Sequence, residues 1–167
     1  MSVLEEFVNN DELHPIDIVE TLAEYRDWDF DRITDDQITM QVEGQWRSYS
    51  ITLAWSAIDE TLRLICTFEM DPPEGRMPEI YETLNRINDT CWAGAFTFWD
   101  EQRLMVWRYG LVLTGGQIAS PEQIDRLIAV AVRTAERFYP AFQLVAWADR
   151  APADAMQVAI AEAYGHA

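Results

Sequence analysis

Residues 37–70 read QITMQVEGQWRSYSITLAWSAIDETLRLICTFEM, and apolar side chains alternate with polar ones in three successive segments of this stretch. A period of two is typical of antiparallel strands that bury one face. Gly44 and the polar run from Ser56 to Glu60 allow the two chain reversals. We therefore predict a three-stranded meander. Its inward side chains are Ile38, Met40, Val42, Tyr49, Ile51, Leu53, Trp55, Leu62, Leu64, Cys66, Phe68 and Met70.

Helices and two more strands are predicted on either side of this meander. Apolar residues at helical spacing follow His14-Pro15 and again follow Pro78, while the alternation of period two starts at Trp28 and resumes at Phe96. The predicted elements are a helix from Pro15 to about Trp28, a strand-like start at Trp28–Asp31, a helix from Pro78 to about Asp89, strands within 96–113, and helices after Ser120 and Pro152. A short helix over Val3–Asn9 is a further expectation.

The strongest local signal is Ser120-Pro121-Glu122-Gln123. A serine hydroxyl at the N-cap, proline at the first helical position and glutamine two residues later are the elements of a capping box. The preceding pair Gly115-Gly116 indicates a turn with positive φ. Pro140 indicates a kink or a restart within the helix that follows.

Composition limits the class of protein. The chain has 167 residues, of which 49% are hydrophobic and 12% aromatic, so it can bury one substantial core. We expect a single α+β domain over residues 1–167, with 1–13 and 166–167 peripheral or frayed. Against 29 acidic residues stand 12 basic ones, all arginine, and the net charge of −17 disfavours nucleic acid and anionic membranes as partners. The absence of a secretory signal and of a cysteine-dense pattern favours a cytoplasmic protein.

Catalytic and metal-binding patterns are incomplete. The chain has two histidines, His14 and His166, and no serine lies in a GxSxG elbow, so a nucleophile lacks its usual base. Asp27, Asp29 and Asp31 have the spacing of the first three calcium ligands of an EF-hand, but the glycine and glutamate that this loop needs are missing. We therefore predict no enzymatic activity, no cofactor and no metal.

The segment LNRINDTCWAGAFTFWDEQRLMVWRYGLVLTGGQIASPEQI, residues 84–124, and the closing FYPAFQLVAWADRAPADAM resemble the YbjN family, which is described as a family of bacterial sensory transduction regulators. The resemblance extends over nearly the whole chain. It implies a fold similar to that of type III secretion chaperones, with the order helix, three strands, helix, two strands, helices. It also implies a regulatory or chaperone-like role and no catalytic residues.

Two hypotheses for function follow. The first is a homodimer that recognises a protein partner through a sheet edge or a groove. The second is a small-ligand or anion sensor with an aromatic-lined pocket, in which Arg63, Arg86 or Arg108 holds the anion. The tryptophans at strand period are expected to lie mainly in the core, with a binding surface as the alternative. These are Trp55, Trp92, Trp99, Trp107 and Trp147.

Overall fold

The computed structural model describes the backbone of residues 14–165 and the side chains of residues 14–160. The expected helix Val3–Asn9 and the peripheral segments 1–13 and 166–167 lie outside this range. The helices are α2 (Pro15–Arg26), a 3-10 turn η1 (Glu74–Arg76), α3 (Met77–Thr90), α4 (Pro121–Trp147) and α5 (Pro152–Gly165). The strands are β1 (Asp29–Thr34), β2 (Gln37–Glu43), β3 (Ser48–Ser56), β4 (Thr61–Glu69), β5 (Ala95–Trp99) and β6 (Leu104–Val112).

The six strands form one antiparallel sheet in the order β1-β2-β3-β4-β6-β5, which confirms the predicted α+β class. Four strands rather than three precede α3. The additional strand is β1, which begins where the alternation at Trp28 and Phe30 was noted and pairs with β2 through Phe30 opposite Met40. The segment that starts at Trp28 is therefore followed by a complete strand, β1, at one edge of the sheet.

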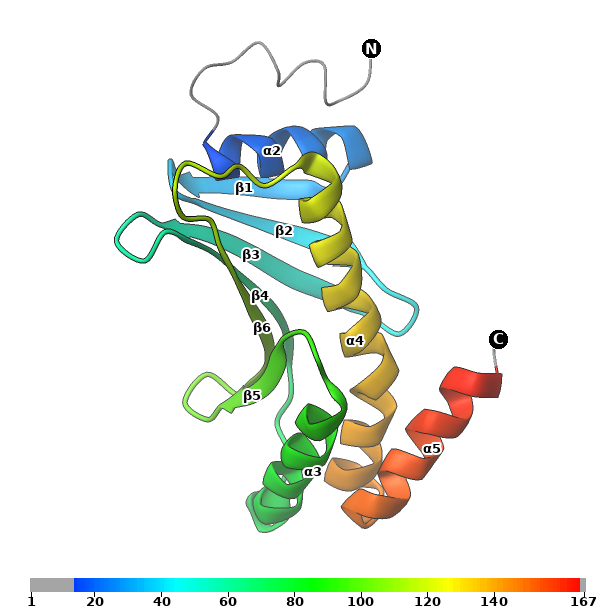
Figure 1. Ribbon diagram of the computed structural model, residues 1–167. Helices are drawn as coiled ribbons and strands as arrows, with labels where there is room; N and C mark the ends of the chain where they lie inside the picture. Colours follow the sequence, from blue (N-terminus) through cyan, green and yellow to red (C-terminus); the bar gives the residue numbers. More distant parts are fainter. Residues whose placement is uncertain (1–13, 166–167) are drawn as a thin grey trace.

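Helices α2, α3 and α4 pack on one face of the sheet, which we call the inner face, and α5 packs against α3 and α4 (Figure 1). There α4 runs across the strands, α2 contacts β1, β2 and β3, and α3 lies against β5. The inward residues of the central strands, such as Ile51 and Leu64, are fully buried between the sheet and the helices. The opposite, outer face carries small polar side chains such as Thr52 and Thr67, and no helix within residues 14–165 covers it.

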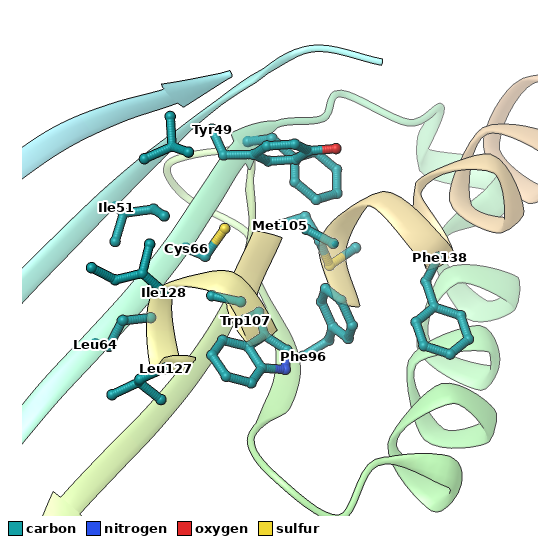
Figure 2. Close-up of a cluster of buried hydrophobic side chains, with 14 of the residues drawn as sticks. Tyr49, Ile51, Leu64, Cys66, Phe96, Met105, Trp107, Leu127, Ile128 and Phe138 are labelled. Atoms are coloured by element: carbon teal, nitrogen blue, oxygen red, sulfur yellow. The ribbon is translucent and has the colours of Figure 1, made fainter. Parts of the chain in front are cut away.

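Aromatic rings fill the core between the sheet and α4 (Figure 2). Phe96 of β5 meets Phe138 and Phe142 of α4 edge to face, with ring centroids 6.2 and 5.4 Å apart. Trp107 of β6 is fully buried and stacks on Tyr109 at 6.2 Å. Such pairs add to the stabilisation that burial of the rings already gives.

The starts of α2 and α4 have side-chain caps. Ser120 Oγ accepts a hydrogen bond from Gln123 N at 3.1 Å, and Ser120 N donates to the Gln123 side chain at 3.3 Å, so the predicted capping box is confirmed. His14, which the sequence places at a helix start, is the N-cap of α2. Its Nδ1 accepts from Ile16 N at 3.1 Å, and its Nε2 therefore donates to Asp36 at 2.7 Å.

A kink or a restart was predicted at Pro140, and the restart is excluded because helix α4 continues without a break through this residue. A proline inside a helix removes one hydrogen bond and costs about 3 kcal/mol. Here Phe138, Ala141 and Phe142, on either side of the proline, are all buried against the sheet. Their burial holds the helix together where its backbone bonding is weakest.

Glu136 of α4 fastens the turn between β2 and β3 to the helix layer. Its carboxylate accepts hydrogen bonds from Gln45 N at 3.0 Å, Trp46 N at 3.2 Å and the hydroxyl of Tyr49 at 2.6 Å. Burial, and then the contact with Glu136, raises the pKa of Tyr49, so the phenol keeps its proton and donates it. One side chain thus satisfies three donors on a segment some ninety residues away.

Asn88, in the last turn of α3, covers the outer edge of β5. Its Oδ1 accepts from Phe96 N at 2.7 Å and its Nδ2 donates to the Phe96 carbonyl at 2.9 Å. The amide therefore bonds to both backbone groups of one residue, as a neighbouring strand would. This prevents another chain from pairing at that point.

We predict that Glu136→Ala lowers the free energy of unfolding by about 3 kcal/mol, because three donors lose their acceptor. Tyr49→Phe, which removes one of the three donors, is expected to cost about 1 kcal/mol. Urea denaturation followed by circular dichroism measures both. Glu101→Ala is the control, since it removes the same charge from an exposed turn; an equal loss in the control would contradict the role of Glu136.

We predict that Asn88→Asp destabilises the protein by about 2 kcal/mol, because the Phe96 carbonyl then faces a carboxylate oxygen in place of an amide donor. Asn85→Asp adds the same charge on the exposed side of the same helix and should cost a few tenths of a kcal/mol at most. Thermal unfolding of the two variants at the same concentration makes the comparison. Equal melting temperatures would show that the Asn88 bonds to β5 are dispensable.

Candidate functional site

The three arginines proposed as ligand or partner contacts lie in two places. Arg63 of β4 and Arg108 of β6 are both exposed and border the same depression on the outer face. Arg86 lies on α3, where its guanidinium is 3.5 Å from the carboxylate of Glu82 one turn earlier. The structure therefore brings Arg63 and Arg108 together and leaves Arg86 apart.

The depression, here called the outer basin, has a volume of about 610 Å³. Its floor is partly apolar, because Ile65 of β4 and Ala95 of β5 lie on either side of Arg108 in the sheet. Trp99 contributes an aromatic wall. Arg63 pairs with Asp59, whereas no acid in the described part of the chain pairs with Arg108.

Two further hollows lie on the inner side of the same region. The first, the inner hollow, has a volume of about 200 Å³ and is mainly apolar, with Arg126 on its rim. It is lined by Ala93, Tyr109, Leu111, Gln123, Arg126, Leu127 and Val130. The second has a volume of about 380 Å³ and lies between α4 and the α3–β5 connection, where Arg133 and Arg137 line it beside Trp92.

Charge is segregated in this part of the surface. The three hollows are bordered by five arginines, and no aspartate or glutamate of the described residues lines any of them. The arginines are Arg63, Arg108, Arg126, Arg133 and Arg137. In a chain with 29 acidic and 12 basic residues, such a region is a local exception to the net charge. It favours an anionic group as its partner.

The tryptophans divide between core and surface. Trp107 is fully buried as expected, but Trp92 has a relative exposure of 102% and Trp147 one of 54%, so the core assignment is wrong for these two. Trp92 follows the end of α3 at Cys91, in a connection rather than a strand. A period of two therefore does not apply to Trp92, and Cys91 is the C-cap of α3 rather than a strand residue.

Neither thiol has the properties of a nucleophile. Burial raises the pKa of the Cys66 thiol to about 12. The pKa of Cys91 is also raised, chiefly by burial, although Thr90 and Arg137 act in the opposite direction. Both are therefore protonated at neutral pH, and a thiol is a weak nucleophile in that form.

The three aspartates considered as calcium ligands do not converge. Asp27 caps the end of α2 in the left-handed conformation, and Asp29 and Asp31 are exposed on the edge strand β1. Among the residues that the structure describes, no group of three His, Cys, Asp or Glu side chains is placed to hold a metal ion. Over the same part of the chain, every helix is too short or too polar to span a membrane.

Comparison with known proteins assigns the chain to a family. The crystal structure of YbjN from E. coli matches with a TM-score of 0.52 at 11% identity, over 80% of this chain and 90% of that one, which establishes similarity of fold. No curated protein matches the sequence. The family model for YbjN, "Putative bacterial sensory transduction regulator", matches residues 15–144, and the chain therefore belongs to the YbjN family.

Proposed function

We propose that this protein is a non-enzymatic regulatory domain, chaperone-like in its mode of action, that works by recognising another protein. The observation that carries the proposal is the fully exposed Trp92 beside hollows lined by arginine and free of acidic residues. An exposed indole contributes nothing to the core, and tryptophan and arginine are the residues most enriched at the energetic centres of protein interfaces. Membership of a regulator family supports the same role.

The protein acts as a homodimer in this proposal, with residues 1–167 as one domain in the cytoplasm. Large apolar side chains are exposed on three helices that pack against one another, namely Tyr81 of α3, Trp147 of α4 and Val158 of α5. A second copy that covered them would remove this apolar area from water. The surface is separate from the hollows beside Trp92, so a dimer could still bind its partner.

A small-ligand or anion sensor is the second candidate, and the outer basin is the observation in its favour. Arg63 and Arg108 lie on neighbouring strands there, next to the ring of Trp99. Two guanidinium groups on one rim could hold a carboxylate or a phosphate. Arg86 has no part in this candidate, because it lies elsewhere and pairs with Glu82.

We predict that light scattering at tens of micromolar gives a mass of about twice 19.3 kDa. Trp147→Glu should shift the protein to the monomer, because a charge would be buried at the proposed apolar contact. Trp92→Ser is the matched control and should remain dimeric. A strict monomer for the unmodified protein would refute the homodimer.

We predict that Trp92→Ser captures much less partner protein than wild type from the native cell extract, with the amount measured by quantitative mass spectrometry. The variant should fold normally, since its side chain is exposed. Trp46→Ser, at a half-exposed tryptophan on the β2–β3 turn, is the control. Equal capture by all three proteins would exclude a role for Trp92 in partner binding.

A thermal-shift screen with nucleotides, phosphate and dicarboxylates separates the two candidates. A specific anion site predicts stabilisation that grows with ligand concentration by mass action and disappears in Arg63→Gln and Arg108→Gln. The protein-recognition role predicts no shift with any of them. Stabilisation that depends on both arginines would favour the sensor.

A further inference from the structure

We propose that the exposed edge of β6 at residues 109–112 is a docking site for an extended, acidic peptide segment, which adds to the sheet as an antiparallel strand in line with β5. The inference rests on the proposed role in protein recognition and deepens it, because it names the site and the chemistry of the partner. The site exists because β5 has five residues and the neighbouring β6 has nine.

Strand β5 ends its pairing with β6 where Ala95 lies opposite Arg108, whereas β6 continues to Val112 (Figure 1). The strand cannot extend further because of Gly94. This residue has φ of +73°, and a Cβ on it would overlap the indole of Trp107 and approach the carbonyl oxygen of Arg108 to 2.9 Å. The chain therefore turns away over Trp107, and β4 is the one strand of the described residues that pairs with residues 109–112.

The ladder geometry shows which backbone groups face the gap. Asn88 bonds to both N and O of Phe96 from outside the sheet, so these groups point away from β6. In an antiparallel ladder the direction alternates from one residue to the next. Ala95 and its partner Arg108 consequently point toward each other, and Gly110 and Val112 direct their N–H and C=O groups into the gap beyond the end of β5.

The two outer edges of the sheet are protected in ways that this gap is not. On β1, Arg32 donates to the carbonyls of Thr34 at 2.9 Å and Asp35 at 2.6 Å. On β5, the Asn88 amide occupies the edge at Phe96. Charged residues and covering side chains are the usual protection against unwanted strand pairing. At β6 the residue in the middle of the gap is instead an exposed glycine, Gly110.

Gly110 is the one glycine within a strand of the described residues. Glycine weakens a strand interior, and its presence there often marks a place where another backbone approaches closely. On the outer face, a Cβ at Gly110 would lie 3.2 Å from Cγ2 of Thr61, so a side chain there would crowd the basin between Arg63 and Arg108.

The hollows on either side define the chemistry of the occupant. Successive residues of an added strand point to opposite faces of the sheet. The peptide residue opposite Gly110 faces the outer basin with Arg63 and Arg108. The peptide residues before and after it face the inner hollow with Leu111, Leu127 and Val130. Acidic side chains suit the outer position and aliphatic side chains the inner ones. Arg63 already pairs with Asp59, so the main charge for the acidic side chains is Arg108, which no acid of the described residues pairs with. Screening over about 8 Å at physiological salt weakens repulsion from the more distant acids.

A second copy of this protein fits the gap poorly. Pairing of two β6 edges would bring Arg108 and Arg126 of both copies into one seam, where like charges repel. The homodimer proposed above uses the exposed face of α3, α4 and α5, so the β6 edge stays available for the peptide.

The test is titration of the full-length protein with the peptide acetyl-EVEVEVE-amide, followed by amide chemical shifts in NMR and by calorimetry. We expect the largest shifts at Gly110 and Val112. The lysine counterpart acetyl-KVKVKVK-amide should not bind. Arg108→Glu combined with Arg126→Glu should weaken binding roughly tenfold, whereas Arg86→Glu, remote from the gap, should leave it unchanged.

N-methylated peptides test strand addition while the protein stays unaltered. In antiparallel pairing, a peptide residue directly opposite Gly110 donates its own N–H to the backbone of β6. Its side chain lies on the outer face, which is where the glutamates are expected. Methylation of the glutamate nitrogens should therefore weaken binding roughly tenfold or more, and methylation of the valine nitrogens should not. Equal effects of the two methylated peptides would overturn strand addition.

The outcomes separate this site from the broader role. Shifts that map away from residues 108–112, or no binding at millimolar peptide, would overturn the β6 site. The proposed function would then still be judged by the partner captured with wild type and lost with Trp92→Ser. If that capture also failed, the protein-recognition role itself would be refuted.

Discussion

The inner face of the sheet depends on one long helix for its cover. A helix of 27 residues extends about 40 Å, enough to cross the sheet and reach past it, and α4 does both (Figure 1). Its apolar stripe buries the inward side chains of the strands, and its last turns hold α3 and α5. This demand explains why α4 stays helical at Pro140: the burial of Phe138 and Phe142 is worth more than the hydrogen bond that the proline removes.

Side chains from the helices complete what the sheet leaves open. Glu136 supplies the acceptor for the β2–β3 turn, and Asn88 supplies a donor and an acceptor for the edge of β5. Each does for the backbone what a neighbouring strand or a water molecule would otherwise do. As a result, the helix layer fixes both the position of a turn and the extent of an edge, in addition to covering the core.

Local patterns in the sequence were sufficient for most of the elements. Alternation identified the central strands, because one buried face imposes a period of two, and the capping box at Ser120 marked the start of α4. The same reasoning undercounted the first strands, since β1 is mostly exposed and its alternation is weak. It also misplaced Trp92, because a single exposed tryptophan in a connection follows no period.

The candidate site was accessible from sequence only in part. Arg63 and Arg108 were two of the three arginines named from the sequence, but their shared basin depends on the pairing of β4 with β6. The contributions of Arg126, Glu136 and Asn88 come from contacts between distant segments, which no local spacing encodes. Gly110 and Gly94 carried a usable signal, since a glycine in or beside a strand suggests close approach of another group.

Gly94 and Trp107 also link the interior of the molecule to its surface. The indole of Trp107 is fully buried, yet its ring lies against Gly94, where the chain leaves β5. The position of the ring therefore determines how many residues of β6 have no strand beside them. A repacking of the core that shifted this ring would widen or narrow the gap without altering any residue that borders it. Divergent relatives could in this way change the length of segment they accommodate by substitutions that are invisible from outside.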